Sequence, residues 1–304
     1  MPRLPCPGEF DELCTFRFTL GRAGDGSRRR RCGTRCPRRR LTCGCRCPAG
    51  IGISSGTEGV GTCLLLPGSD LGPVGQCGNS VGFAIANPYN GPGTGDPQYT
   101  QAIQRARAAG MTVTGYVATG YFGTTGITTR SGSTDPAEWM CQIKSDIDTW
   151  YRLYGGAGLG GIFFDESLSR CGAGNVDVNR YIELRAYVEQ RHGAASAVVD
   201  NPGTGVEECY TAAADTLVTF EGNDTSYRTH RQQSSETRVP ADRIWHMIYS
   251  SPDENTLRTA VSLRKQRNAG HVYVTPDTVA DGNPWHTLPS ISYLNTQLSL
   301  ADAP

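Results

Sequence analysis

The sequence lacks any long hydrophobic run and any overall excess of one charge. No stretch of about 18 apolar residues occurs in the 304 residues, so no transmembrane helix is expected. The first thirty residues do not show the basic, apolar and small-residue order of a signal peptide. The 29 basic and 29 acidic residues cancel, but they are distributed unevenly along the chain.

The uneven part is residues 1–50, which carry 12 Arg, no Lys and only four acids. Seven of the twelve Cys also lie there, yet they lack the repeated C-x-x-C pair that favours a zinc site. The Arg runs at 28–31 and 38–40 could bind nucleic acid electrostatically, but a disordered arm or a wrongly assigned gene start is the simpler interpretation. We therefore predict a low-complexity Arg- and Cys-rich arm over residues 1–59, a domain over residues 60–304, and no nucleic-acid partner.

Several short motifs are also absent. No G-x-G-x-x-G follows the first predicted strand, which weakens a dinucleotide-binding interpretation. No H-x-x-x-H or H-x-H occurs and the five His are scattered, so we predict neither a metal site nor a cofactor. The five Cys beyond the arm are Cys63, Cys77, Cys141, Cys171 and Cys209. An odd count permits two disulfides and one free thiol, and the sequence does not choose the pairing.

From residue 60 onward, apolar runs of strand length alternate with helical stretches. We predict strands at 60–66, 81–86, 111–118, 161–164, 197–199, 216–220, 243–249 and 271–274, and helices at 98–109, 135–154, 176–191, 254–268 and 289–300. Such alternation implies parallel pairing, and eight parallel units close as a barrel, whereas a doubly wound sheet usually needs fewer. The chain length suits one barrel of about 250 residues plus an extension. The predicted fold class is therefore α/β, a (β/α)8 TIM-type barrel.

Candidate site residues come from the strand ends, because catalytic groups of a (β/α)8 barrel project from the C-terminal ends of its strands. The polar residues there are Asn87, Thr119, Asp165, Glu166, Asn201, Glu221, Tyr249, Thr275 and Asp277. Asp165 directly follows Phe164 and Glu221 directly follows Phe220, on the rim of an apolar core. Burial there can raise the pKa of one acid, and a second acid nearby raises it further.

Hydrolysis of a glycosidic bond needs such a pair of carboxyls. One is protonated to supply the leaving oxygen with its proton, and the other is ionised to attack or stabilise the oxocarbenium-like centre. We therefore predict that Asp165, Glu166 and Glu221 are catalytic. The alternative is that Asp165, Glu166 and Asp277 bind a divalent cation.

The predicted substrate-binding residues are Asn87, Tyr89, Thr119, Tyr121, Asn201, His246, Tyr249 and Asp277. The aromatic residues that could stack on a sugar are Tyr89, Tyr116, Tyr121, Trp245 and Trp285, of which Trp245 lies inside a strand and is more typical of a core. A buried, hydrogen-bonded role is the alternative for His246. Asn87 and Asn201 each precede Pro and could simply shape turns.

Four motifs occur in order along the chain: NPYNGPG at 87–93, GYVAT at 115–119, GIFFDE at 161–166 and NPGT at 201–204. Together they resemble the spherulin-four-like family of cell-surface proteins, over residues 62–300. The resemblance implies a (β/α)8 barrel like those of glycoside hydrolase family 135, which cleave α-1,4-linked N-acetylgalactosamine in galactosaminogalactan. It also implies an extracellular or cell-surface location and a polysaccharide partner.

The same resemblance implies roles for the acids: Asp165 as nucleophile, Glu221 as general acid/base, and Glu166 as a hydrogen-bond partner of sugar hydroxyls. In an α-linked N-acetylgalactosamine the acetamido group is cis to the leaving oxygen and cannot attack from the back. A retaining enzyme then needs its own carboxylate, with the two carboxyls about 5–5.5 Å apart, whereas a gap near 9 Å would indicate inversion.

The start of the domain departs from the family pattern. The strand at 60–66 has no aromatic residue, where family members have an aromatic-rich one, and Leu71 stands where a Trp is expected. The first strand and any sugar stacking there therefore stay open. A catalytically silent glycan-binding barrel is the alternative function, but the presence of all three acids favours an enzyme.

Overall fold

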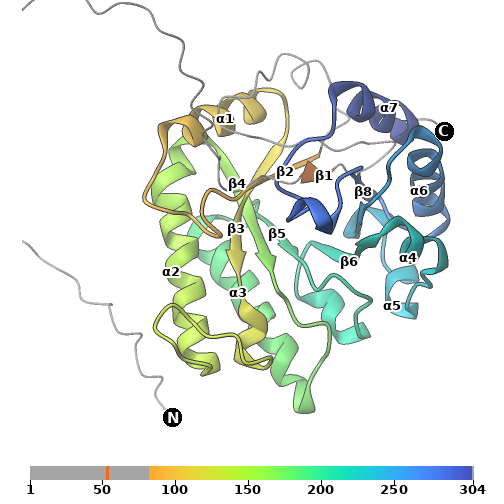
Figure 1. Cartoon of the computed structure of the whole chain (residues 1–304). Coiled ribbons are helices and arrows are strands. Elements are labelled where there is room, and N and C mark those ends of the chain that lie inside the picture. Colours follow the sequence, from red (N-terminus) through yellow and green to blue (C-terminus); the bar gives the residue numbers. More distant parts are fainter. Residues whose placement is uncertain (1–52, 55–81, 303–304) are drawn as a thin grey trace, which may run out of the picture. The chain divides into compact units, whose positions relative to one another are not determined.

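The computed structural model describes residues 53–54 and 82–302, all within the compact unit Pro48–Pro304. Its centre is one curled sheet in the order β1 to β8, in which β2 to β8 all run parallel (Figure 1). The strands are β1 Ile53–Ser54, β2 Phe83–Ala86, β3 Thr112–Ala118, β4 Leu159–Asp165, β5 Ala197–Asp200, β6 Thr216–Asn223, β7 Ile244–Tyr249 and β8 His271–Val274. The predicted α/β, TIM-type fold class is confirmed.

The first predicted strand, at residues 60–66, lies outside the described residues. β1 is a different segment, and it pairs antiparallel with β2 through Ile53 and Ser54. These two residues precede the predicted domain boundary between residues 59 and 60. The boundary itself falls outside the described residues and stays a prediction.

Helices flank the sheet, as the alternating pattern predicts (Figure 1). They are α1 Pro97–Ala108, α2 Pro136–Tyr154, α3 Val176–His192, α4 Asp224–Thr229, α5 Ser234–Thr237, α6 Glu254–Gln266 and α7 Ile291–Asp302. Short 3-10 turns are η3 Gly120–Gly123, η4 Gly155–Ala157, η5 Ala173–Asn175, η6 Glu208–Ala212, η7 Ala241–Arg243 and η8 Val279–Asp281. Helix α2 begins where the Asp135 side chain accepts the Ala137 N–H and Pro136 occupies the first turn. Among the helices described, none is long and apolar enough to cross a membrane.

Large side chains fill the interior of the sheet and its contact with α2. Inside, the Trp245 ring lies 5.8 Å from that of Phe163, so the core position expected for Trp245 is confirmed. Outside, Trp150 of α2 packs on Gly115 of β3, where a Cβ atom would stand only 2.4 Å from the indole. The Trp150 indole N–H donates to the Tyr116 carbonyl at 2.7 Å, which fixes the helix against the strand.

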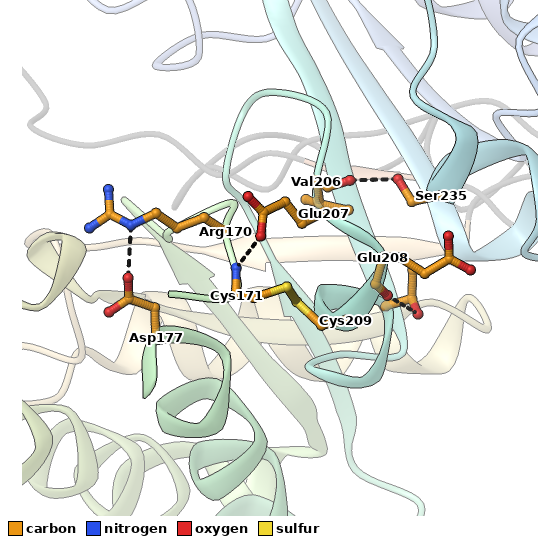
Figure 2. Close-up of a disulfide and its surroundings, with 9 residues drawn as sticks. Arg170, Cys171, Asp177, Val206, Glu207, Glu208, Cys209 and Ser235 are labelled. Carbon is orange, nitrogen blue, oxygen red and sulfur yellow. Dashed lines mark hydrogen bonds and ion pairs between the residues drawn. A yellow bond between two sulfur atoms is a disulfide. The ribbon is translucent and has the colours of Figure 1, made fainter. Parts of the chain in front are cut away.

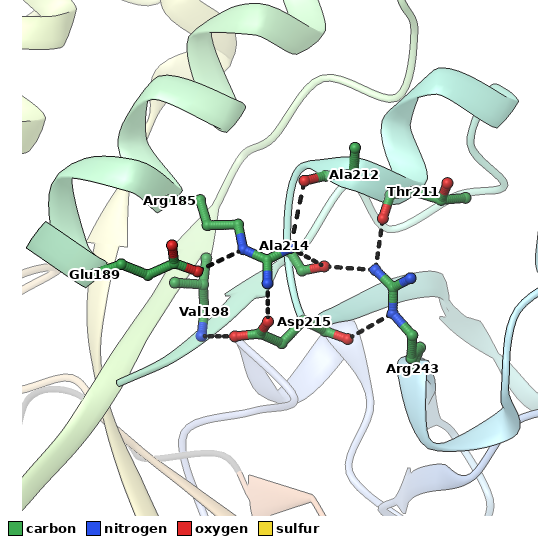
Figure 3. Close-up of polar contacts among 8 residues, drawn as sticks. All are labelled: Arg185, Glu189, Val198, Thr211, Ala212, Ala214, Asp215 and Arg243. Atoms are coloured by element: carbon green, nitrogen blue, oxygen red, sulfur yellow. Dashed lines mark hydrogen bonds and ion pairs between the residues drawn. The ribbon is translucent and has the colours of Figure 1, made fainter. Parts of the chain in front are cut away.

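An ion-pair network ties the strands together at their N-terminal ends (Figure 3). Asp215, directly before β6, accepts Arg185 of α3 at 2.5 Å and the Val198 N–H of β5 at 2.9 Å. The Arg243 side chain, directly before β7, donates to the Asp215 carbonyl at 3.1 Å. Contacts at this end of a barrel support stability, which leaves the C-terminal ends of the strands for a site.

One disulfide joins two loops that follow strand ends (Figure 2). Cys171, between β4 and α3, is bonded to Cys209 of η6, between β5 and β6. The Cys171 N–H also donates to the Glu207 carboxylate at 2.8 Å. Cys141 is disulfide-bonded as well, while Cys63 and Cys77 lie outside the described residues. The cross-link fixes the loop after β4 against the loop after β5.

Candidate active site

The three predicted acids come together at the C-terminal ends of β4 and β6. Asp165 and Glu221 line both of two adjoining cavities, of about 470 and 410 Å³, and Glu166 lines the second. Asn201 and Trp285 also belong to both cavities. The acids from two different strands therefore share one groove that is open to solvent.

Asn201 links the two central acids directly. Its side-chain amide nitrogen donates to Asp165 Oδ1 at 2.8 Å and to Glu221 Oε2 at 2.6 Å. These two carboxylate oxygens are therefore no farther apart than the sum of 2.8 and 2.6 Å. This upper bound for the two bridged oxygens is compatible with the separation of about 5–5.5 Å in retaining glycosidases and is shorter than a gap near 9 Å.

Asp165 is the acid best held in its ionised form. Burial raises its pKa, but hydrogen bonds from the Tyr116 hydroxyl and the Asn201 amide oppose that rise. The Tyr116 hydroxyl donates to Asp165 Oδ2 at 2.7 Å, so each carboxylate oxygen has its own donor. Hydrogen bonds to a carboxylate stabilise the charged state.

Glu221 is the acid best placed to keep a proton. Burial raises its pKa and the Asp165 charge raises it further, against hydrogen bonds from Asn201 and Trp285. The Trp285 indole N–H donates to Glu221 Oε1 at 2.8 Å. The register of β6 against β7 shifts between Val218 and Phe220, directly before Glu221. Such bulges re-aim side chains next to active sites.

Glu166 sits on a strained turn. Its φ is 54°, in the left-handed region that non-glycine residues seldom adopt. The turn is held because the Glu166 carbonyl accepts the Tyr121 N–H at 2.8 Å and the Thr119 hydroxyl at 2.7 Å. Burial raises the pKa of Glu166, and the Asp165 charge raises it further.

Five of the eight predicted substrate-binding residues line the groove: Asn87, Tyr89, Tyr121, Asn201 and Tyr249. Tyr89 is 60% exposed, which leaves its ring free for a ligand at one end of the groove. Asn87 also shapes its turn, because its side-chain oxygen accepts the Gly91 N–H at 3.1 Å.

The other three predicted residues do not line either cavity. Thr119 and His246 are completely buried, which corrects their assignment, whereas that of Asp277 stays a prediction. Thr119 is fully buried and its hydroxyl bonds to the Asp165 and Glu166 carbonyls. His246 faces the helices, because side chains alternate along β7 and Trp245 takes the inward position; its Nδ1 lies 2.8 Å from the Tyr227 hydroxyl. Asp277 closes its own loop by accepting the Thr287 hydroxyl.

Two contacts were missed by the sequence-based reasoning. Tyr116 and Trp285 are candidate stacking residues, but each donates a hydrogen bond to one of the predicted acids. Side chains alternate between the two faces of β3, and this places the Tyr116 side chain inside the sheet, beside the end of β4. That alternation could have indicated the contact between Tyr116 and Asp165. Trp285 lies in the loop between β8 and α7, and no sequence signal places it against β6.

The cavity acids do not gather as metal ligands within the part of the chain that the structure describes. The clusters there with three ligating atoms within 4.8 Å of one another do not include Asp165, Glu166 or Glu221. One of those clusters is Cys171, Glu207 and Cys209, whose two sulfurs are already joined.

Comparison with known proteins gives the family. The model of the spherulation-specific family 4 matches residues 78–300, which is most of the chain. The chain belongs to this family. Spherulin-4 of Physarum polycephalum is 28% identical over 233 residues, which cover 73% of this chain and 62% of spherulin-4. The chain therefore spans about three fifths of the length of that relative. The resemblance carried by the four motifs is confirmed.

A solved structure gives the same fold. Sph3 of Aspergillus clavatus, determined in complex with GalNAc, matches with a TM-score of 0.62 at 22% identity. The match covers 83% of this chain and 98% of Sph3. It establishes that this spherulation-specific family member has the α/β fold of Sph3.

Proposed function

We propose that this protein is a glycoside hydrolase that cleaves an amino-sugar-containing polysaccharide, with α-1,4-linked N-acetylgalactosamine as the preferred unit. The observation that carries the proposal is the pair of acids bridged by Asn201 in an open groove. The bound GalNAc of Sph3, a protein of the same fold, supports an amino sugar as the ligand. The family relationship supports an extracellular or cell-surface location.

The proposed reaction has two steps with retention of configuration. In the first, Asp165 attacks the anomeric carbon while Glu221 gives its proton to the leaving oxygen, which forms a glycosyl–enzyme ester. In the second, Glu221 takes a proton from water, and the water oxygen displaces Asp165 from the anomeric carbon. The raised pKa of Glu221 suits the first step, and the donors on Asp165 suit its ionised form.

The groove offers places for sugar on both sides of the acids. Tyr89 and Asn87 line the first cavity, and Tyr121, Tyr249 and Glu166 line the second. Aromatic faces pack on the apolar face of a sugar, and a carboxylate accepts from its hydroxyls. Glu166 therefore serves as a hydrogen-bond partner of the substrate in this proposal.

Product release from galactosaminogalactan and a panel of other glycans tests the proposal. Asp165→Asn and Glu221→Gln should each lower the rate by about 10²–10⁴-fold or more, since each removes one carboxyl of the pair. Glu138→Gln is the matched control, because that exposed acid of α2 lines neither cavity, and the variant should keep near wild-type activity.

Two results would reject the hydrolase. Full activity in both groove variants would remove the proposed site. A folded wild type that binds glycan and releases no product would favour the catalytically silent glycan-binding barrel.

A further inference from the structure

A second group of titratable side chains lies outside the groove, between the sheet and helices α4 and α5. His246 of β7, Glu236 of α5 and His230, directly after α4, bring their ligating atoms within 4.8 Å of one another. His246 Nε2 lies 3.9 Å from Glu236 Oε2, and His230 Nε2 lies 4.0 Å from the same oxygen. The proposed hydrolysis uses none of these three residues.

Hydrogen bonding does not explain this convergence. Both distances are too long for hydrogen bonds, and neither Nε2 atom has a hydrogen-bond partner among the residues that the structure describes. The side chains of His246 and Glu236 are completely buried, where an unsatisfied polar atom is costly. Two ring nitrogens aimed at one carboxylate oxygen are typical of ligands that share a cation.

Neighbouring groups hold the ligands in orientation. The Tyr227 hydroxyl lies 2.8 Å from His246 Nδ1, which leaves Nε2 as the nitrogen available for a metal. Glu236 Oε1 accepts the Gln233 N–H at 2.8 Å, and Oε2 accepts the Thr219 hydroxyl at 3.1 Å. Outer partners of this kind fix the rings and carboxylates of metal sites.

The surroundings of the two rings are compatible with a metal. Burial lowers the pKa of His246 to about 4 and also lowers that of His230, which favours the neutral imidazole that binds a metal. Burial alone would raise the pKa of Glu236, but His246 and the hydrogen bonds from Gln233 and Thr219 hold it below its usual value. Arg267, whose guanidinium lies 4.4 Å from the centre of the Tyr227 ring, opposes a cation here, and the Glu236 charge offsets it.

We propose that His230, Glu236 and His246 form a binding site for a divalent transition-metal ion, with Zn²⁺ as the best fit. Two imidazole nitrogens and one carboxylate suit Zn²⁺, whereas Ca²⁺ and Mg²⁺ prefer oxygen ligands. Ligands of one tetrahedral Zn²⁺ lie about 3.4 Å apart, so each nitrogen–oxygen pair needs to close by roughly half an ångström. A water molecule would complete the coordination.

Such an ion would clamp the helices α4 and α5 onto the strands that carry the groove. Glu236 accepts Thr219 of β6, and the His230 ring lies 4.8 Å from the Phe220 ring, directly before Glu221. The site is structural in this proposal. The sequence predicts no metal because the three ligands have no short spacing motif and meet only in the fold.

The test uses the full chain, stripped of metal with a chelator and titrated with zinc sulfate in a calorimeter. We expect one Zn²⁺ at this site, and affinity reduced more than about 100-fold in Glu236→Gln and His246→Gln. His192→Gln is the matched control, because the His192 ring lies 3.4 Å from Asp148 and outside the cluster of His230, Glu236 and His246. This variant should bind Zn²⁺ as tightly as wild type does. Cobalt substitution should give visible d–d bands without a thiolate charge-transfer band.

Circular dichroism verifies that each variant folds. His230→Gln provides a milder variant, because the His230 side chain is 14% exposed and its loss is better tolerated. Wild type that binds no Zn²⁺ would overturn the proposal. So would undiminished binding in the folded ligand variants, or a thiolate band, which would place the ion on cysteines elsewhere in the chain.

Discussion

Tyr116, Asn201 and Trp285 donate hydrogen bonds to the two central acids, which favours the ionised form of each acid against the effect of burial. Tyr116 donates a hydrogen bond to Asp165, Trp285 donates one to Glu221, and Asn201 donates to both acids. Since two close acids titrate together, each limb of a pH–rate profile belongs to the pair. Removing a hydrogen-bond donor to one acid should nevertheless shift mainly the limb of the profile that depends on the pKa of that acid.

Tyr116→Phe should move the acidic limb of the kcat/KM profile to higher pH. The hydroxyl stabilises ionised Asp165, so its loss raises the pKa of the group that must be ionised to attack. A hydrogen bond to a charged group contributes about 1.5–3 kcal/mol, which corresponds to roughly one to two pH units. Rates on galactosaminogalactan across pH measure the shift, and an unmoved acidic limb would contradict the assigned role of Asp165.

Trp285→Phe should instead move the basic limb to higher pH. The indole N–H stabilises ionised Glu221, so its loss raises the pKa of the group that must stay protonated. Activity should then persist to higher pH than in wild type, while the acidic limb stays close to its original position. The same pH series measures both limbs, and a basic limb that moves to lower pH would exclude Glu221 as the acid.

The sequence predicted the acids better than their partners. Asp165 and Glu221 follow apolar strands directly, so the barrel rule places them at the strand ends. His246 was misassigned because alternation alone does not say which face of β7 is inward until the interior Trp245 is located. Trp285 reaches Glu221 from a loop, and loop paths depend on tertiary packing that no local pattern encodes.

At the scale of helices and strands, close packing of α2 on β3 positions Tyr116. The Trp150 indole rests on Gly115 and donates to the carbonyl of Tyr116, the residue that serves Asp165. A side chain at position 115 would have to displace the ring or the helix. Packing of this kind transmits a change on the outer face of the sheet to the groove.

Gly115→Ala should destabilise the protein by about 1–3 kcal/mol, since overpacking forces side chains and backbone to shift. The added Cβ would stand 2.4 Å from the Trp150 ring. Gly156→Ala is the matched control, because nothing lies within 4 Å of a Cβ there. Denaturant unfolding of both variants measures the difference, and equal stabilities would contradict the close approach.

Long elements were predicted and short ones were not. The helix over Pro136–Tyr154 carries its own cap, first-turn proline and apolar face, all of which are readable locally. The short helices Asp224–Thr229 and Ser234–Thr237 were missed, because so few residues give no helical period. Their positions depend on contacts with β6 and β7 instead, such as that between Glu236 and Thr219.

At the scale of the whole molecule, a buried carboxyl makes stability depend on pH. Asp200 at the end of β5 is completely buried. Burial raises its pKa well above the usual value, and the Tyr210 hydroxyl and Arg185 charge offset only part of that rise. The contribution of this group to stability is therefore complete below the unfolded pKa of about 3.9 and is lost as pH rises toward the folded pKa.

Asp200→Asn should remove the part of the pH dependence of stability that is due to this carboxyl, and it should raise the free energy of unfolding at pH 7. The gain should be about 1.4 kcal/mol for each unit by which the fold raises the pKa, because the unfolded variant no longer gains by ionising. Urea unfolding at several pH values measures it, with the exposed Glu138→Gln as control. A variant less stable than wild type at pH 7 would show that Asp200 is ionised in the fold.

The overall architecture was predictable because seven parallel strands and their long helices each carry a local signal. The strand predicted at 60–66 and the proposed boundary of the arm fall outside the described residues, so both stay predictions. The sheet also includes Ile53–Ser54, which has too few residues to show a strand pattern. The convergence of β4 and β6 on one groove follows from the barrel, and the Asn201 bridge follows only from the fold.

The most direct test of the paired acids is to identify, by proton NMR before mutarotation, the anomer that the wild-type protein releases first from galactosaminogalactan. The gap bridged by Asn201 predicts retention, so the α-anomer should appear first. Initial release of the β-anomer would show inversion and would contradict Asp165 as nucleophile.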